Sequence, residues 1–176
     1  MPDVTQPKMD AVDRITAQWK AVRPDVDTSP MEVIGRVSRL SRLIDRRLGE
    51  NFAQFGLDDW MYDVLATLRR SGEPYELHAG DLMRQSMVTT GAITNRIDRL
   101  EQRGLVERAP SSDRRKVIVR LTKQGLDTVE SVVDAHMATE REILGGLSER
   151  QQREMVSLLR TALLALGDQA TTQEAG

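Results

Sequence analysis

The stretch MVTTGAITNRIDRLEQRGLVERAPSSDRRKVIVRLTKQG, residues 87–125, contains the most informative structural pattern of this chain. Its first part places Ile93, Ile97 and Leu100 at helical spacing, which predicts an amphipathic helix over residues 89–103. Two strand-like runs, LVER and KVIVRL, follow on either side of the polar tip APSSDRR, a pattern typical of a short hairpin. The stretch therefore predicts a helix that leads directly into a β-hairpin.

A second short helix is expected just before this stretch, over residues 80–85, so that two helices and a tight turn precede the hairpin. Further helices are expected over residues 10–22, from Ser29, from Asp58, from Thr122 and from Ser148. Ser29 precedes a proline and then a glutamate, which is the signature of an N-cap serine with proline in the first turn. The predicted fold class is mainly α: a winged helix–turn–helix with a small β-hairpin wing, flanked by N- and C-terminal helices.

The terminal helices have apolar stripes that a compact central domain would not cover, which favours a homodimer, although packing within one chain is an alternative. The expected organisation is an N-terminal extension with one helix (1–28), a dimerisation or linking helix (29–56), the winged helix–turn–helix (57–122), C-terminal dimerisation helices (123–167) and a disordered tail (168–176).

The charge of the chain is unevenly distributed. Residues 84–123 hold ten Lys or Arg and four Asp or Glu, a local charge of +6, so the rest must carry −8 to reach the formal net charge of −2. A basic segment in an acidic protein is expected where that segment alone meets a polyanion. The alternative is a basic surface that only contacts solvent.

A winged helix–turn–helix places its second helix in the major groove of DNA, although many such domains bind proteins instead. On a helical wheel, Asn95 and Arg99 face away from the core, where Asn suits an adenine edge and Arg a guanine edge or a phosphate. The N-terminal half of the helix, where base contacts are commonest, also holds Thr89, Thr90 and Gly91.

The quoted stretch strongly resembles the MarR family of dimeric bacterial repressors, and the resemblance covers residues 29–166. Its densest part is the recognition helix followed by GLVER, DRR and LTKQG. The family's wing motif corresponds to Asp113 and Arg115, with Arg114 between them. The resemblance implies that Arg115 enters the minor groove while Asp113 steadies the wing; a surface ion pair at the hairpin tip is the alternative.

The helix expected over residues 10–22 and the motifs YDVLATL and TNRIDRL are similar to the urate-responsive branch of this family. Thr90 stands where serine is frequent in that branch. The resemblance implies a purine pocket formed by Trp19, Asp63, Arg96 and Arg108, and release from DNA when the ligand binds. An indole offers a stacking face, and arginine donates to an anion such as urate in a planar fork.

Each of these residues also has a simpler interpretation. Trp19 lies on the apolar stripe of its helix, as a core residue would, and Asp63 is off the stripe of its own helix. Arg96 borders the interior, where it needs an acidic partner or an anion, and Arg108 is an ordinary surface charge of a wing strand. Only the four together favour a ligand pocket.

Catalysis is not expected. The chain has no cysteine, no phosphate-binding glycine loop and two histidines far apart in sequence, so we expect no catalytic residue, metal site or cofactor. No apolar run would span a membrane and no secretion signal is visible, which favours the cytoplasm. The expected partners are a palindromic operator, a small anionic ligand and a second copy. A repressor that answers to a tricarboxylate or phenolic acid is one alternative, and a ligand-independent DNA-binding dimer is another.

Overall fold

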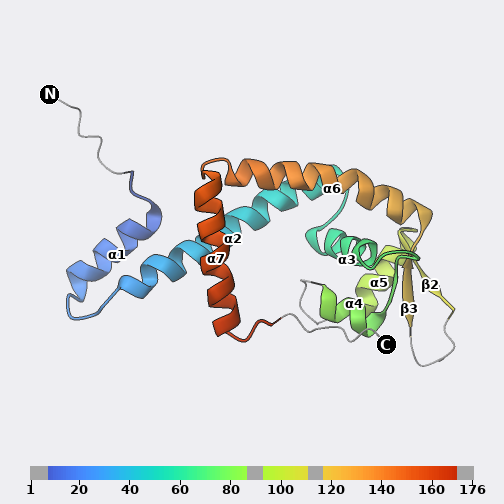
Figure 1. Cartoon of the computed structure of the whole chain (residues 1–176), viewed down its shortest axis with the longest axis horizontal. Helices are drawn as coiled ribbons and strands as arrows, with labels where there is room; N and C mark the ends of the chain where they lie inside the picture. Colours follow the sequence, from blue (N-terminus) through green and yellow to red (C-terminus); the bar gives the residue numbers. More distant parts are fainter. Residues whose placement is uncertain (1–7, 87–92, 111–116, 170–176) are drawn as a thin grey trace. The chain divides into compact units, whose positions relative to one another are not determined.

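The computed structural model describes residues 8–86, 93–110 and 117–169. The described part of the chain is mainly helical with one small antiparallel sheet, as the sequence predicts (Figure 1). It divides into two compact units, with the boundary between Asp59 and Trp60. The described residues include no helix that is long and apolar enough to cross a membrane.

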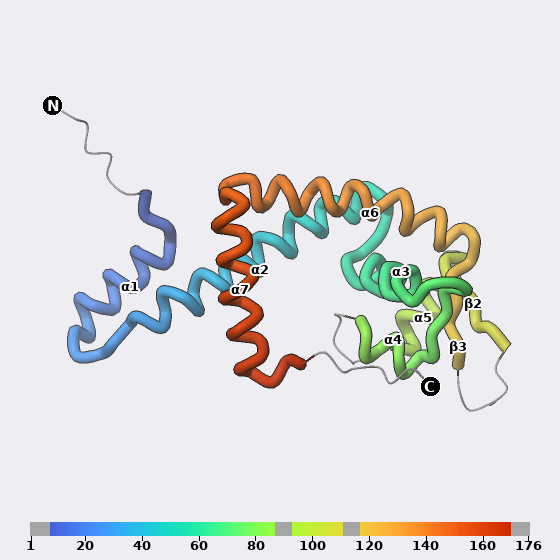
Figure 2. Tube along the Cα trace, in the orientation of Figure 1, coloured from blue at the N-terminus to red at the C-terminus, as the bar shows by residue number. Residues whose placement is uncertain are grey.

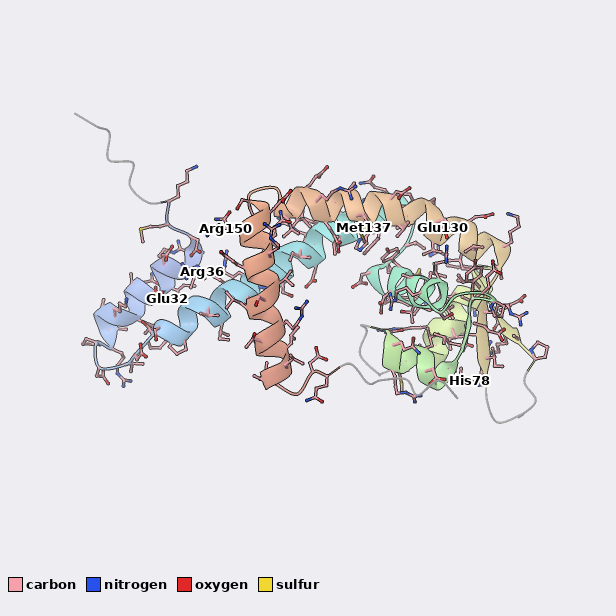
Figure 3. All side chains as sticks on the ribbon, in the orientation of Figure 1. Glu32, Arg36, His78, Glu130, Met137 and Arg150 are labelled. Carbon is pink, nitrogen blue, oxygen red and sulfur yellow. The ribbon has the colours of Figure 1, made fainter. Side chains whose placement is uncertain are left out.

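The first unit is a pair of helices, α1 (Ala11–Val22) and α2 (Ser29–Gln54), joined by a short loop (Figure 2). Asp10 caps α1 in a capping box with Asp13. Arg36, which is labelled on α2 in Figure 3, forms ion pairs with both carboxylates. A Cβ at Gly35 would lie 3.2 Å from Cγ1 of Val12, so the helices meet where α2 has no side chain.

The start of α2 differs from the expectation. Thr28, rather than Ser29, occupies the N-cap position, and its side chain makes no capping hydrogen bond. The Ser29 hydroxyl instead donates to Asp27 at 3.0 Å. The local signature therefore identifies the helix start to within one residue. The Ser29 hydroxyl does not cap the helix, because it is hydrogen-bonded to Asp27.

The second unit contains the winged helix–turn–helix. Helix α3 (Asp59–Arg70) supplies much of its core, because Val64, Leu65 and Leu68 are fully buried. Strand β1 (Glu76–His78), helix α4 (Ala79–Gln85) and helix α5 (Ile93–Gln102) follow, and strands β2 (Val106–Ala109) and β3 (Ile118–Leu121) form the described part of the wing (Figure 1).

The sheet has three strands rather than the expected two, in the order β1-β3-β2. Arg120 of the central strand lies opposite Glu76 on one side and Glu107 on the other, and forms ion pairs with both. Strand β1 is not evident in the sequence because three residues are too few to show an alternating pattern. Its pairing depends on a strand more than forty positions later in the chain.

The last two helices begin beside Thr122 and Ser148, where the sequence predicts their starts. Thr122 accepts a hydrogen bond from Gly125 at the start of α6 (Lys123–Leu144), and Ser148 forms a capping box with Gln151 at the start of α7 (Glu149–Ala165). A Cβ at Gly125 would lie only 1.9 Å from the carbonyl oxygen of Leu105, so α6 approaches the root of the wing as closely as a glycine permits.

Candidate functional site

Helix α5 is held by its buried side and presents polar residues on the other. Ile97 and Leu100 are buried in the core of the second unit. Asn95 and Arg99, the described residues of the helix that are candidates for DNA contact, are exposed. The two anchors fix the rotation of α5 about its axis, so the exposed side chains are presented in a defined direction. The remaining candidates for DNA contact lie outside the described residues: Thr89, Thr90, Gly91, Asp113, Arg114 and Arg115.

Two arginines of α5 share one aromatic partner. The guanidinium carbons of Arg96 and Arg99 lie 5.5 Å and 5.0 Å from the ring centroid of Trp60, which is the second residue of α3 and is half-buried. Both distances are within the range of a cation–π interaction. Arg96 thus contacts an indole, whereas the sequence predicts an acidic group or an anion beside it.

Arg108 joins strand β2 to helix α5. Its guanidinium donates from Nη2 to the carboxylate of Asp98 and from Nη1 to the carboxylate of Glu101, both on α5. The hydrogen bond with Asp98 raises the pKa of Arg108 further above its usual value, and the charges of both carboxylates act in the same direction. An anion that approaches Arg108 must therefore compete with two carboxylates that the arginine already binds.

The four candidate ligand residues are divided between the two units. Trp19 is on α1 in the first unit and is 43% exposed, so it is not the core residue that the apolar stripe suggests. Asp63 on α3 is half-buried, and its backbone carbonyl accepts a hydrogen bond from Thr67 at 2.7 Å. Arg96 is half-buried on α5, and Arg108 is an exposed residue of β2.

Three residues of this region, Trp60, Asp98 and Glu101, are not among the residues predicted from the sequence. Trp60 shows no local sign of its role, because its partners are more than thirty positions away. Asp98 and Glu101 are three residues apart on one helix, a spacing that brings two carboxylates to the same side. That spacing is a usable signal for an arginine partner, but the choice of Arg108 depends on how the wing folds back on α5.

The described residues contain no group of three or more His, Asp or Glu side chains that could hold a metal ion. The clustered groups around α5 are arginines, carboxylates and an indole. Such groups bind and orient charged partners through ion pairs, hydrogen bonds and cation–π contacts.

Comparison with known proteins agrees with this architecture. Residues 61–117 match the model of the MarR family. The chain is 42% identical to the HTH-type transcriptional regulator PecS of Dickeya dadantii (strain 3937) over 149 residues, which cover 84% of this chain and 90% of the relative.

Two solved structures share the fold at 25% identity, and each has a TM-score of 0.67 and covers 78% of this chain. One is a mutant MarR from Escherichia coli complexed with operator DNA, 99% of which is covered. The other is Bordetella bronchiseptica BpsR, 98% of which is covered, whose DNA binding is regulated by 6-hydroxynicotinic acid. The relatives are transcriptional regulators and not enzymes. This chain, with its winged helix–turn–helix, belongs to the MarR family of DNA-binding transcriptional regulators.

Proposed function

We propose that this protein is a homodimeric repressor that binds a pseudo-palindromic operator and is released by a small anionic ligand, urate or a related purine. The observation that supports the proposal is that three arginines of α5 and the adjacent wing strand are held by specific partners. Arg96 and Arg99 contact the ring of Trp60, and Arg108 pairs with two carboxylates of α5. An anion that binds these arginines would change the orientation of side chains on α5 and on the wing strand, and these two elements also contact DNA in the proposal.

In this proposal α5 reads the major groove. Asn95 contacts an adenine edge, and Arg99 contacts a guanine edge or a phosphate. The solved complex of a related MarR with operator DNA supports this use of the fold. Thr89, Thr90 and Gly91, which precede α5 in the sequence, add base contacts, and Asp113, Arg114 and Arg115 bind at the minor groove.

Dimerisation is supported by large apolar side chains that the single chain leaves exposed. Helix α7 has no buried residue, and Leu158 is 72% exposed. Helices α1 and α2 also enclose an apolar groove of about 500 Å³ beside Arg39 and Arg42. We assign a second copy of the chain as the cover, because a two-fold dimer presents two recognition helices to two half-sites. The exposed apolar residues on α2 and α7 include Val33, Ile34, Val37, Leu40, Leu43, Val156, Leu158, Leu159, Leu163 and Leu164.

The proposed ligand site consists of Trp19, Asp63, Arg96 and Arg108. Trp19 stacks on the ring of the ligand, the two arginines donate to its anionic edge, and Asp63 is repelled by its charge. Arg108 is bound to α5 through Asp98 and Glu101. A ligand that binds Arg108 would favour a conformation in which the wing is no longer tied to α5. The ligand would then bind this conformation more tightly than the tied one, and that difference in ligand affinity is what a switch requires.

A different anion is the second candidate. BpsR, which shares the fold, has its DNA binding regulated by 6-hydroxynicotinic acid, a planar aromatic carboxylate. Such a molecule could also stack on an indole and bind an arginine fork. A tricarboxylate or a phenolic acid would bind the same arginines through its carboxylate groups, whereas a ligand-independent dimer would stay on its operator in the presence of every anion.

The experiment is a titration of the protein bound to a labelled DNA fragment from upstream of its own gene, followed by fluorescence anisotropy. Urate, xanthine, 6-hydroxynicotinate and citrate are added separately, at constant ionic strength and pH. Release by urate or xanthine at sub-millimolar concentration supports the proposal. If only 6-hydroxynicotinate or citrate releases the DNA, that anion and not a purine is the ligand. If no anion releases the DNA at millimolar concentration, the protein is a ligand-independent DNA-binding dimer.

A further inference from the structure

Trp60 links two arginines to which the proposed function gives different tasks. Arg99 is a candidate for DNA contact and Arg96 a candidate for ligand contact, yet both guanidinium groups lie over the same indole, at 5.0 Å and 5.5 Å. The two arginines are three residues apart on α5, which places them on neighbouring parts of the helix surface. A change at one of them therefore alters the surroundings of the other through their shared partner.

The indole is held by a rigid part of the fold. Met61, which follows Trp60, is 3% exposed, and Val64 and Leu65 one turn later are fully buried, so the first turn of α3 is anchored in the core. Helix α5 is anchored separately by Ile97 and Leu100. The ring and the two arginine stems thus start from backbone positions that the core holds.

An unrestrained arginine on a helix surface loses much rotamer freedom when it binds a base edge or a phosphate. An aromatic face that already holds the guanidinium reduces this loss, because the side chain is oriented before DNA arrives. Tryptophan is the side chain that binds cations most strongly in this way. Its position here, beneath two arginines of the recognition helix, is that of an orienting group.

We propose that Trp60 is a positioning residue of the recognition helix, which orients Arg99 for DNA binding and makes the orientation of Arg99 dependent on the state of Arg96. This inference rests on the proposed function, since it assumes that α5 contacts DNA. It extends that function by naming a residue outside both candidate sites as their connection.

A first test compares aromatic and aliphatic substitutions at this position, with operator affinity measured by anisotropy. Trp60→Phe and Trp60→Tyr retain a π face and are expected to bind operator within about threefold of the parent, whereas Trp60→Met loses the face and binds about tenfold more weakly. Equal losses in Phe and Met variants would overturn the proposal, because a residue that only fills space would give that result. Arg69→Met is the matched control: Arg69 lies 5.1 Å from the ring of Tyr75 and pairs with Glu130 on α6, so operator affinity should not change.

A double-mutant cycle tests the coupling to Arg99. If Trp60 acts through the arginines, Trp60→Met should cost about tenfold in the parent but only about threefold in an Arg99→Met background. Strict additivity of the two losses would contradict the proposal. Thermal unfolding of each variant shows whether it is folded at the temperature of the binding assay.

A fluorescence measurement tests the contacts without DNA and without altering Trp60. In a Trp19→Phe background Trp60 is the sole tryptophan, since the chain has two. Arg99→Met and Arg96→Met should each change its emission, whereas Arg69→Met should not; unchanged spectra in both α5 variants would overturn the proposal. If the spectra change but the parent binds no DNA, the contacts stand and the proposed function fails. If the parent binds DNA and the spectra do not change, the positioning role alone fails.

Discussion

Arg108 of β2 donates to the carboxylate of Asp98 on α5, so the strand that leads into the wing is tied to the recognition helix. Glu101, one turn further along α5, accepts from the other terminal nitrogen of the same guanidinium. A planar guanidinium that donates to two carboxylates restricts the relative orientation of the strand and the helix more than a single ion pair does. The relative orientation of the wing and α5 therefore depends in part on a contact that an anionic ligand could break.

The first prediction concerns these two carboxylates. The double variant Asp98→Asn, Glu101→Gln should bind urate about fivefold more tightly, because the ligand no longer displaces two acids from Arg108. Isothermal titration of the DNA-free protein measures this affinity. The control is Glu149→Gln, which removes an exposed carboxylate paired with Arg153 on α7 and should leave ligand affinity unchanged. Unchanged affinity in the double variant would place the ligand away from Arg108.

The second prediction concerns the wing. Arg115→Ala should weaken operator binding and reduce the slope of log affinity against log salt by about 1, as expected for the loss of one phosphate-neutralising cation. Anisotropy across a series of salt concentrations gives the slope. Arg150→Ala removes a cation on α7 that is paired with Glu154 and should leave the slope as it is. A slope that stays constant in Arg115→Ala would exclude Arg115 from the DNA contact.

The third prediction separates ligand response from DNA binding. Trp19→Ala should bind operator as the parent does, yet require at least about tenfold more urate for release, because a stacking aromatic is lost. Trp19 is 43% exposed on α1, so its removal should cost little stability. Trp19→Phe keeps a smaller stacking surface and should give an intermediate response. A parent-like response in Trp19→Ala would remove this residue from the ligand site.

The fourth prediction concerns packing at the root of the wing. Gly125→Ala would place a Cβ 1.9 Å from the carbonyl oxygen of Leu105, so the start of α6 must shift and the free energy of unfolding should fall by about 1–3 kcal/mol. Chemical denaturation followed by circular dichroism measures the change. Gly49→Ala is the control, since a Cβ there meets no atom within 4 Å, and alanine in α2 should be neutral or stabilising. Equal stability of the two variants would refute the close approach.

The fifth prediction is a pH dependence of α1. The backbone N–H of Asp13 donates to the Asp10 carboxylate and, with the amide of Val12 and the guanidinium of Arg36, lowers the pKa of Asp10. Because the pKa is lower in the folded state, the stabilisation of α1 is present above the ordinary carboxyl pKa and is lost as the pH falls below about 4.

Trp19 reports this change when Trp60→Phe makes it the sole tryptophan. Its emission should shift on acidification below about pH 4, and Asp10→Asn, which caps a helix without titrating, should reduce the shift. The same acid transition in both proteins would show that another group controls α1.

The local chemistry of the chain predicts much of the fold. Asp10, Thr122 and Ser148 begin helices where capping residues precede apolar periodicity, and Gly104 ends the recognition helix region with a φ of 68°. These features depend on neighbours within four positions, so a single sequence contains them. The family follows from the dense motif after α5, and the 42% identical relative supports it.

Contacts between residues that are far apart in the chain could not be predicted from the sequence alone. Strand β1 forms because residues 76–78 pair with residues 118–120 of β3, and the role of Trp60 depends on α3, which brings it close to Arg96 and Arg99. The partners of Arg108 likewise depend on the path of the chain between α5 and β2. Hydrophobic periodicity and capping act over one or two turns, so the sequence alone predicts the helices and the two strands of the wing but not strand β1. The pairing of charges and aromatic faces joins positions that are far apart in the chain, so it depends on the folded arrangement and not on local sequence.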